Sequence, residues 1–515
     1  MRRLLVGLVL VCALAFPRAA HAFCGFYVSG AGGPMFNDAT QVVLMRDGVR
    51  TVLSMQNHYQ GPPDAFAMVV PVPVVLSKNA VKTLPREVFA KIDQLDAPRL
   101  VEYWEQDPCN PHRGHDMLQS LPGVAMEALS DSGGSKRDLG VKVEAKFSVG
   151  EYDIVILSAK DSGGLETWLA QEKYKIPPGA EPYLRPYVQR GSKFFVAKVD
   201  PKRVKREDGK TVLSPLRFHY DSPEFALPIR LGLVNAGSAQ DLIVHVLAKG
   251  QRYEVANYPN VLVPTNLDVN EATREQFGAF YAALFDRVLA KNPKAIVTEY
   301  AWQAGSCDPC PVPPLDLDAL ATLGADVLPS VGDEEDPNAL PGQFVLTRLH
   351  ARYTKDSLGA DLVFREAGPI MGGREVRGEG GKLERSAVGS HDNNFQARYA
   401  IRHPWKGAIN CSSPQRGIWG GPPNGAGTST PKAARDLAFV PRGKVQLATF
   451  IAEDSAELDV VAKPAAQGDP PLGVVVPPPA HTCGCNLSRS RGVASFALFA
   501  IPLAMIALRR WRRRY

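Results

Sequence analysis

The chain has 515 residues, of which 45% are hydrophobic and 22% charged, enough to bury a sizeable core or two. Its formal net charge of +6 includes +3 from Arg2, Arg3 and Arg18 and +5 from the arginines after residue 508, which leaves −2 for residues 23–508. No basic excess remains for binding nucleic acid, so that class of partner is excluded.

Residues 1–22 are predicted to be a cleavable secretory signal. Arg2 and Arg3 precede an apolar stretch that ends at Phe16, and the small residues Ala20 and Ala22 follow. We therefore expect an exported protein. A lipoprotein anchor at Cys24 is rejected, because Phe23 is not the small residue that such processing requires before the cysteine.

Residues 23–310 are predicted to form a β-rich α+β domain. Its clearest element is a hairpin, because the apolar runs 42–45 and 49–55 flank an Asp-Gly turn. A strand over 66–73 follows, and its prolines place its end at a sheet edge or exit. Further strands are expected at 142–148, 152–158, 193–200, 211–220, 226–235, 241–248 and 295–302.

Four helices are expected. The longest runs from Glu271 to Lys291 with Asn270 as its N-cap, because large apolar residues recur from Phe277 to Leu289 at i, i+3, i+4 spacing. This aromatic stripe is typical of a core face. A second helix covers Arg86–Leu95 after Pro85, and shorter helices are expected at 164–173 and 315–324.

Three segments follow this domain. Residues 311–341, which are rich in proline and carry the acidic run 333–336, are predicted to be a linker. Residues 342–462 form a second strand-rich segment, with strands at 343–353, 361–365 and 395–401. Residues 463–482 are rich in proline and are predicted to form a semi-stiff stalk that lifts the body off a membrane.

Residues 483–515 are predicted to be a membrane sorting and anchor tail. The apolar run Val493–Leu508 would form a helix about 24 Å long, short for a hydrocarbon core of about 30 Å. The arginines after it favour a cytoplasmic carboxyl end.

This tail resembles a known sorting signal. Cys483-Gly484-Cys485, the short apolar helix and the terminal arginines, preceded by the proline-rich spacer, are similar to the myxobacterial C-terminal sorting domain of surface proteins. The resemblance implies that Cys483 or Cys485 is the processing and anchoring point, and that the helix and arginines are a removable signal. The alternative is a disulfide between the two cysteines, which a one-residue spacing strains.

The body carries a second resemblance. Residues 24–28, the predicted hairpin and residues 61–73 are similar to the opening of a bacterial exported family known as domain of unknown function 2330. Residues 347–353 and 361–365 continue this similarity, which covers most of residues 24–370. The family has no established activity or site, so the resemblance implies no catalytic or binding residues.

After signal removal the body holds five cysteines, which suit an oxidising compartment and allow at most two disulfides among Cys24, Cys109, Cys307, Cys310 and Cys411. Cys307 and Cys310 have the spacing of a redox or zinc half-site. The prolines that follow oppose the helix start that a redox motif needs, and no second pair of zinc ligands follows. A structural disulfide is favoured, either local or from one of these cysteines to Cys411.

A second cluster collects possible metal ligands. Cys109, His112, His115 and Asp116 lie in one short stretch and are competent ligands for zinc or copper. Pro111 and Gly114 make this stretch a loop, where histidines are mostly solvated. Metal binding is therefore the weaker interpretation, and a disulfide between Cys24 and Cys109 is favoured.

The sequence thus predicts an α+β fold, β-rich with mainly antiparallel sheets and a few helices, plus one short C-terminal membrane helix. It predicts an exported protein held at the cell surface as a structural or binding component of the envelope, with no cofactor. The expected partners are the membrane, sorting machinery and another envelope component. The alternative is an envelope hydrolase or thiol-redox enzyme that uses residues 109–116 or 307–310. No catalytic residue is assigned, because no nucleophile-elbow, Walker or His-Glu-x-x-His sequence occurs.

Overall fold

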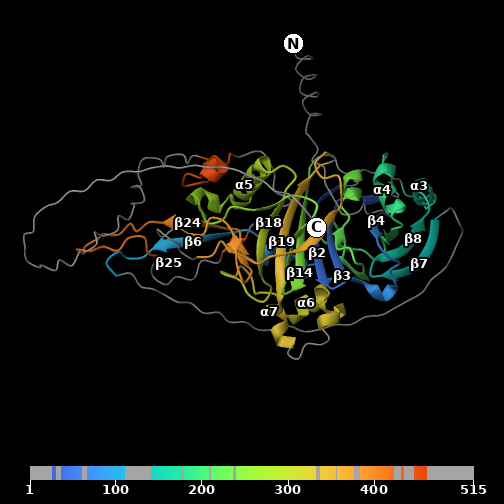
Figure 1. Ribbon diagram of the computed structural model, residues 1–515, viewed down its shortest axis with the longest axis horizontal. Coiled ribbons are helices and arrows are strands. Elements are labelled where there is room, and N and C mark those ends of the chain that lie inside the picture. The colour runs from blue at the N-terminus through green and yellow to red at the C-terminus, as the bar shows by residue number, and fades with distance from the viewer. Residues whose placement is uncertain are drawn as a thin grey trace, which may run out of the picture. The chain divides into compact units, whose positions relative to one another are not determined.

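The computed structural model describes the following residues, all within the unit Met1–Pro471: 26–29, 36–60, 66–110, 141–172, 174, 179–207, 210–235, 239–331, 337–354, 356–375, 383–422, 431–433 and 446–460. Figure 1 shows the arrangement of its strands and helices.

Two large sheets dominate the fold. The central sheet has the strand order β22 (Val388–Gly389), β21 (Ile370–Gly372), β23 (Asn394–Gln396), β18 (Ile296–Gln303), β19 (Phe344–Tyr353), β14 (Gln240–Lys249), β2 (Phe36–Asp47), β3 (Arg50–Gln60), β12 (Leu216–Asp221), β5 (Val81–Thr83), with β16 (Asn260–Leu262) beside β18. The side sheet has the order β1 (Phe26–Ser29), β4 (Phe66–Val72), β9 (Lys193–Val199), β8 (Tyr152–Ala159), β7 (Val141–Val149).

Smaller sheets complete the strand inventory. The arm sheet contains β17 (Leu267–Asp268), β24 (Arg398–His403), β6 (Arg99–Glu105), β25 (Trp419–Gly420) and β26 (Lys432–Ala433). A three-stranded sheet joins β13 (Ala226–Leu227), β20 (Leu362–Ala367) and β15 (Arg252–Val255), and β10 (Lys205–Glu207) pairs with β11 (Lys210–Val212).

Six α-helices occur among the described residues: α2 (Glu87–Asp96), α3 (Ser162–Gln171), α4 (Glu181–Gln189), α5 (Phe277–Lys291), α6 (Leu317–Leu323) and α7 (Leu340–Gln343). Short 3₁₀ turns are η1 (Lys78–Ala80), η2 (Arg230–Asn235), η3 (Glu271–Arg274), η4 (Ala325–Val327), η5 (Pro329–Val331), η6 (Pro337–Ala339), η9 (Leu447–Thr449) and η10 (Ala456–Leu458). The predicted β-rich fold with mainly antiparallel pairing and few helices is confirmed. None of the described helices is both long and apolar enough to cross a membrane, and the predicted tail helix lies outside the described residues.

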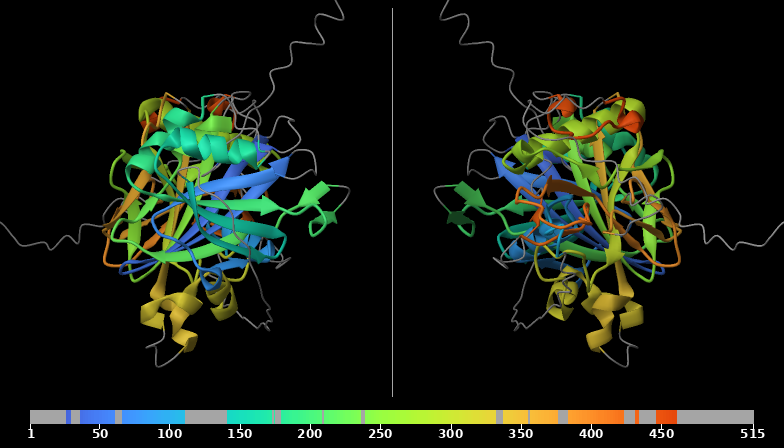
Figure 2. Two further views of the ribbon diagram at one scale, coloured as in Figure 1. Left: turned by 90° about the vertical axis from the view of Figure 1, so that its right-hand side faces the viewer. Right: turned by 90° about the vertical axis from the view of Figure 1, so that its left-hand side faces the viewer.

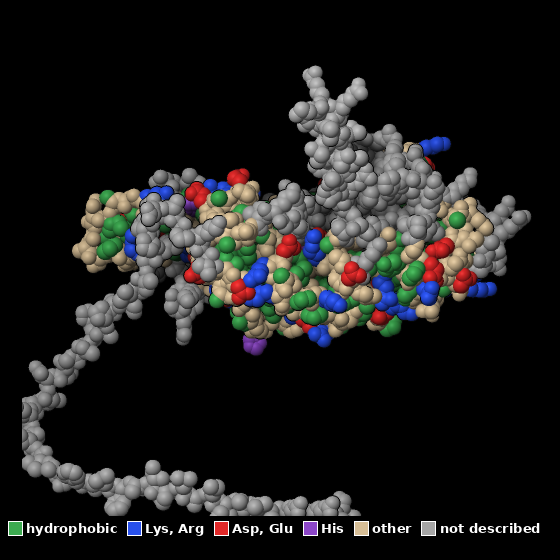
Figure 3. Space-filling model, turned by 90° about the horizontal axis from the view of Figure 1, so that it is seen from above, with side chains coloured by type: hydrophobic (Ala, Val, Ile, Leu, Met, Phe, Trp, Pro, Cys, Tyr) green, Lys and Arg blue, Asp and Glu red, His purple; other side chains and the backbone are tan. Residues whose placement is uncertain are grey.

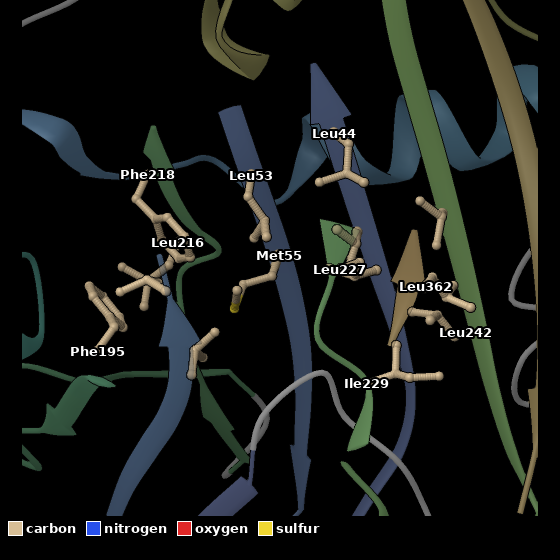
Figure 4. Close-up of a cluster of buried hydrophobic side chains, with 14 of the residues drawn as sticks. Leu44, Leu53, Met55, Phe195, Leu216, Phe218, Leu227, Ile229, Leu242 and Leu362 are labelled. Carbon is tan, nitrogen blue, oxygen red and sulfur yellow. The ribbon is translucent and has the colours of Figure 1, made fainter. Parts of the chain in front are cut away.

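The central and side sheets pack face to face, and helices cover their outer faces (Figures 1 and 2). In β2, Val42 and Leu44 join the core between the sheets while Val43 and Met45 face α2 and α6, because successive side chains of a strand alternate between its faces. Figure 4 shows the inner core, where Leu44, Leu53 and Leu242 of the central sheet gather with Phe195 of the side sheet. α3 and α4 cover the outer face of the side sheet, and α5 covers part of the central sheet.

The predicted hairpin is confirmed. β2 pairs with β3 in antiparallel register from Asp47↔Arg50 onward, and Gly48 adopts the positive φ of +54° that the tight turn requires. The helix at 86–95 is confirmed as α2. The long helix begins later than predicted, at Phe277, because residues 271–274 form the separate turn η3.

Two predicted strands were wrong, and two elements were not predicted. Residues 226–235 form the two-residue β13 and then η2, since Pro228 interrupts the strand. The strand predicted at 211–220 is split by Pro215 into β11 and β12. The helix α4 and the strand β6 were not predicted, and α4 carries Pro182 in its first turn and Pro186 inside it.

Residues 311–341 also differ from the predicted linker. Leu315, Leu320 and Leu340 are at most 5% exposed and belong to the core on the outer face of the central sheet. The strand that follows, β19, lies between β14 and β18, so residues before 310 and after 342 share one sheet. The two predicted segments are therefore parts of one folded unit.

Candidate functional site

Charged side chains gather on the outer face of the central sheet. Pairing of β14 with β19 places His245 opposite Arg348 on this face, and α2 and α5 cover it. We call the set the ionic network; its members are at most 5% exposed and are Asp93, Asp96, Asp241, His245, Glu299, Arg348 and His350.

Arg348 binds three carboxylates. Its Nε donates to Oε2 of Glu299 at 2.7 Å, and its Nη1 donates to Oδ1 of Asp93 and Oδ1 of Asp96, both also at 2.7 Å. Burial alone would lower the pKa of Arg348, but the three carboxylates raise it well above its usual value. One guanidinium thus links strand β18 to helix α2 through strand β19.

His350 is held between two further carboxylate contacts. Its Nδ1 lies 2.7 Å from Oε1 of Glu299 and its Nε2 lies 3.1 Å from Oδ1 of Asp241, while its ring stacks on Phe285 at 4.0 Å. Because each ring nitrogen faces an acceptor, both nitrogens carry protons and the ring is a buried imidazolium. Burial lowers the pKa of His350, but these carboxylates raise it overall.

Glu299 is the shared acceptor of the network. It also accepts a hydrogen bond from the hydroxyl of Tyr281 in α5 at 2.8 Å. Burial would raise the pKa of Glu299, but His350, Arg348 and Tyr281 lower it to about 2. The carboxylate is therefore ionised at neutral pH.

Asp93, Asp96 and His245 could hold a metal ion by geometry, since each offers a ligand atom within 4.8 Å of the others. Nη1 of Arg348 already donates to both carboxylates, and Nδ1 of His245 lies 2.6 Å from Oδ2 of Asp96. The guanidinium supplies the positive charge that a metal would bring, so a metal does not fit this group.

The ionic network is suited to holding the fold together. Its side chains are buried, and they connect α2, α5 and three strands. Breaking such a buried pair by removing one partner typically costs about 3–5 kcal/mol.

The structure pairs the cysteines differently from the favoured prediction. Cys109 forms a disulfide with Cys411 rather than with Cys24, which lies outside the described residues. The reason is the parallel register of β6 and β24, which sets Trp104 beside His403 so that both chains leave the sheet at the same end. The sulfur of Cys109 is bonded to Cys411, so it is not a thiolate ligand for the metal cluster predicted at residues 109–116. The other predicted ligands His112, His115 and Asp116 lie outside the described residues.

Cys307 and Cys310 form a local disulfide, and neither reaches Cys411. Cys307 is 8% exposed and packs in the core beside α6, whereas Cys310 is half-buried. The predicted anchoring residues Cys483 and Cys485 lie outside the described residues.

Glu105 reinforces the segment that carries Cys411. Its carboxylate accepts hydrogen bonds from Nε of Arg416 at 2.7 Å, from the Gly417 amide at 2.8 Å and from the Trp405 amide at 2.9 Å. Burial would raise the pKa of Glu105, but these donors lower it to about 2. Segment 404–417 is therefore fixed to β6 by a carboxylate as well as by the disulfide.

Sequence reasoning did not find the ionic network. One signal was present: the strand predicted at 343–353 alternates apolar residues with Arg348, His350 and Arg352. Such alternation ordinarily marks a solvent-facing side, and only the covering helices show that this side is buried.

Comparison with known families identifies the body of the chain. Residues 18–365 match the model of a family described as an uncharacterized protein conserved in bacteria, DUF2330. No curated protein and no solved structure matches the chain.

Proposed function

The chain belongs to the DUF2330 family of uncharacterized bacterial proteins, and on that premise we propose that it is exported and held at the cell surface as a structural or binding component of the envelope. The predicted signal at residues 1–22 would direct export. The predicted tail at residues 483–515 would anchor the protein, with Cys483 or Cys485 as the processing point.

One observation carries this proposal: the disulfide between Cys109 and Cys411, which are separated by 302 positions in the sequence. Structural disulfides persist in exported proteins and are rare in the cytosol, where thiols are kept reduced. The second disulfide, Cys307–Cys310, supports the same compartment.

A structural or binding role is supported by the placement of the charged groups. The ionic network is buried and serves packing, while Figure 3 shows acidic and basic side chains interspersed on the face that it draws. Such a surface does not favour nucleic acid, which selects a basic patch.

The test is the location and mature C-terminus of the protein in its own cells. Mass spectrometry of the membrane fraction should find a chain that starts near Phe23 and ends at or near Cys483 or Cys485. An intact Tyr515 in the membrane would contradict processing and leave a simple anchor, and a protein that stays in the cytoplasm with free thiols would contradict the whole proposal.

A thiol-redox enzyme is the second candidate, supported by the half-buried position of Cys310 in a local disulfide. A partner dithiol would attack Sγ of Cys310, the Cys307–Cys310 bond would break, and the partner would leave as a disulfide while both cysteines became thiols. Selective reduction of this pair by a thioredoxin-like dithiol, with Cys109–Cys411 left intact, would favour this candidate. A hydrolase using residues 109–116 loses its thiol to the Cys109–Cys411 disulfide, so no observation favours it.

A further inference from the structure

The chain passes from the central sheet into the arm sheet through β23 and β24 (Figure 1), and four buried polar side chains lie on these two strands and on the strands paired with them. Gln396 ends β23 and Arg398 begins β24, so with Ala397 between them the two side chains lie two residues apart on the same face. Gln396 is opposite Tyr300 of β18, and Arg398 is opposite Arg99 of β6. We call Arg99, Tyr300, Gln396 and Arg398 the quartet; each is at most 1% exposed.

The two arginines of the quartet lack acidic partners. Arg99 donates to the carbonyls of Leu95 at 2.6 Å and Pro309 at 2.7 Å, and its guanidinium carbon lies 5.5 Å from the centre of the Tyr300 ring. Arg398 donates to Oδ1 of Asn266 at 2.9 Å and to the hydroxyl of Tyr103 at 3.0 Å. Within the described part of the chain, no carboxylate forms an ion pair with either arginine.

The contrast with Arg348 shows what is missing. Arg348 is equally buried and binds three carboxylates, whereas Arg99 interacts with the Tyr300 hydroxyl and, among acidic groups, with Asp96, already bound to Arg348, and the exposed Asp308. Burial lowers the pKa of Arg99. A buried cation without a counter-charge is costly unless an anion accompanies it.

Nη2 of Arg398 and Oε1 of Gln396 are buried polar atoms without a hydrogen-bond partner. The Arg99 guanidinium and the Tyr300 hydroxyl interact with each other, and the hydroxyl, as the acceptor, keeps its own proton to donate. The Gln396 amide nitrogen already donates to the carbonyls of Asp308 and Gly373, so its oxygen is left as an acceptor. The quartet therefore offers one free donor on the Arg398 guanidinium, the hydroxyl proton of Tyr300 beside the Arg99 guanidinium, and one acceptor.

From this complement we propose that the quartet binds a small oxyanion that also carries a hydroxyl group. Its charged oxygens would accept from Arg398 and Tyr300 beside the positive charge of Arg99, and its hydroxyl would donate to Gln396. Hydrogen phosphate and a hydroxycarboxylate such as glucuronate both have this chemistry. Sulfate does not, because it carries no proton at neutral pH.

The loop that carries the Cys307–Cys310 disulfide separates the quartet from solvent. Its carbonyls at Asp308 and Pro309 accept from Gln396 and Arg99, while Asp308 is exposed and Pro309 is half-buried. An anion would enter beside this loop. The site is formed by the body alone and does not depend on where the protein is located. A failure of anion binding and a failure of the proposed surface location are therefore separate results.

The test uses the full mature chain, freed of phosphate. Equilibrium dialysis and thermal unfolding should show saturable binding of inorganic phosphate or of glucuronate, with sulfate at least about tenfold weaker because it would oppose the Gln396 oxygen. Binding of phosphate assigns an inorganic or phosphoryl ligand, and binding of glucuronate alone assigns a sugar acid. If neither ligand binds the wild-type chain more than chloride does at equal ionic strength, the proposal is refuted without any variant.

Two matched variants locate the site. Arg398→Met should weaken binding by about tenfold or more, since it removes a charge-assisted donor. Arg402→Met, on the same strand, removes an arginine that is paired with Asp268 at 2.7 Å and should leave binding unchanged. Equal loss in both variants would refute the assignment to the quartet, and circular dichroism verifies that each variant is folded.

Discussion

Replacing Arg348 by methionine should destabilise the protein by about 3–5 kcal/mol at neutral pH. The guanidinium makes hydrogen bonds of 2.7 Å to Glu299, Asp93 and Asp96, and all four residues are at most 3% exposed. Methionine fills much of the same apolar volume. The loss therefore comes from three carboxylates that remain buried without their cation.

The assay is equilibrium unfolding in urea followed by circular dichroism. The midpoint should fall while the dependence of the unfolding free energy on urea stays the same. Arg365→Met is the matched control, because the Arg365 side chain is 58% exposed and pairs with Glu254, so its loss should cost at most about 1 kcal/mol.

The pH dependence distinguishes a charge effect from a packing effect. The pKa of Glu299 is lowered from 4.5 to about 2 in the folded protein, so its contribution to stability is present above pH 4.5 and is lost as the pH falls toward 2. Without Arg348 this carboxylate takes up a proton more readily, and the gap between variant and wild type should narrow below pH 4.5. A gap under about 1 kcal/mol at neutral pH, or one that does not change with pH, would refute the reasoning.

Three further predictions follow from other parts of the fold. The pKa of His350 is raised in the folded protein, so its contribution to stability is fully present below pH 6.5 and is lost as the pH rises through the folded pKa. His350→Gln should therefore remove part of the loss of stability that urea titrations of the wild type show at alkaline pH. Identical alkaline profiles of variant and wild type would contradict a buried imidazolium. Cys411→Ser should lower the unfolding free energy by about 2–5 kcal/mol, because the disulfide closes a loop across 302 positions, and reductant should then have little further effect on that variant. Gly324→Ala should destabilise the protein by more than about 2 kcal/mol, since Gly324 has φ +135° and an added Cβ would lie 2.6 Å from Val52. The control Gly359→Ala should be nearly neutral, because the space around Gly359 is open. Calorimetric unfolding midpoints that fall equally in both variants would contradict this prediction.

Local patterns in the sequence predicted the elements whose signals are local. The Asp-Gly turn predicted the β2–β3 hairpin, and the aromatic spacing after Phe277 predicted α5. The layering of two sheets was not predicted, because pairs such as β14 with β2 join residues roughly 200 positions apart and have no local signature.

The candidate sites were harder to predict for the same reason. Arg348 meets Glu299 across 49 positions and Asp96 across 252, so its partners are set by sheet order rather than by spacing. Cys109 offered several partners by composition alone, and the parallel pairing of β6 with β24 selects Cys411. Charged residues at every second position of a strand usually face solvent, so their burial here is evident only once the helices that cover this face of the sheet are known.

The segment that contains β23 and β24 sets a limit on where the chain can be cut. The family match ends at residue 365, yet β23 pairs with β18, and Tyr399 and Phe450 pack on Phe280 of α5 with ring centres 4.9 and 5.9 Å away. A fragment that stops at 365 would leave residues 300–302 of β18 without their partner strand and α5 with an uncovered aromatic face, both of which promote aggregation. Recombinant work on this protein therefore needs a chain that continues at least to residue 460, beyond the stretch by which the family is recognised.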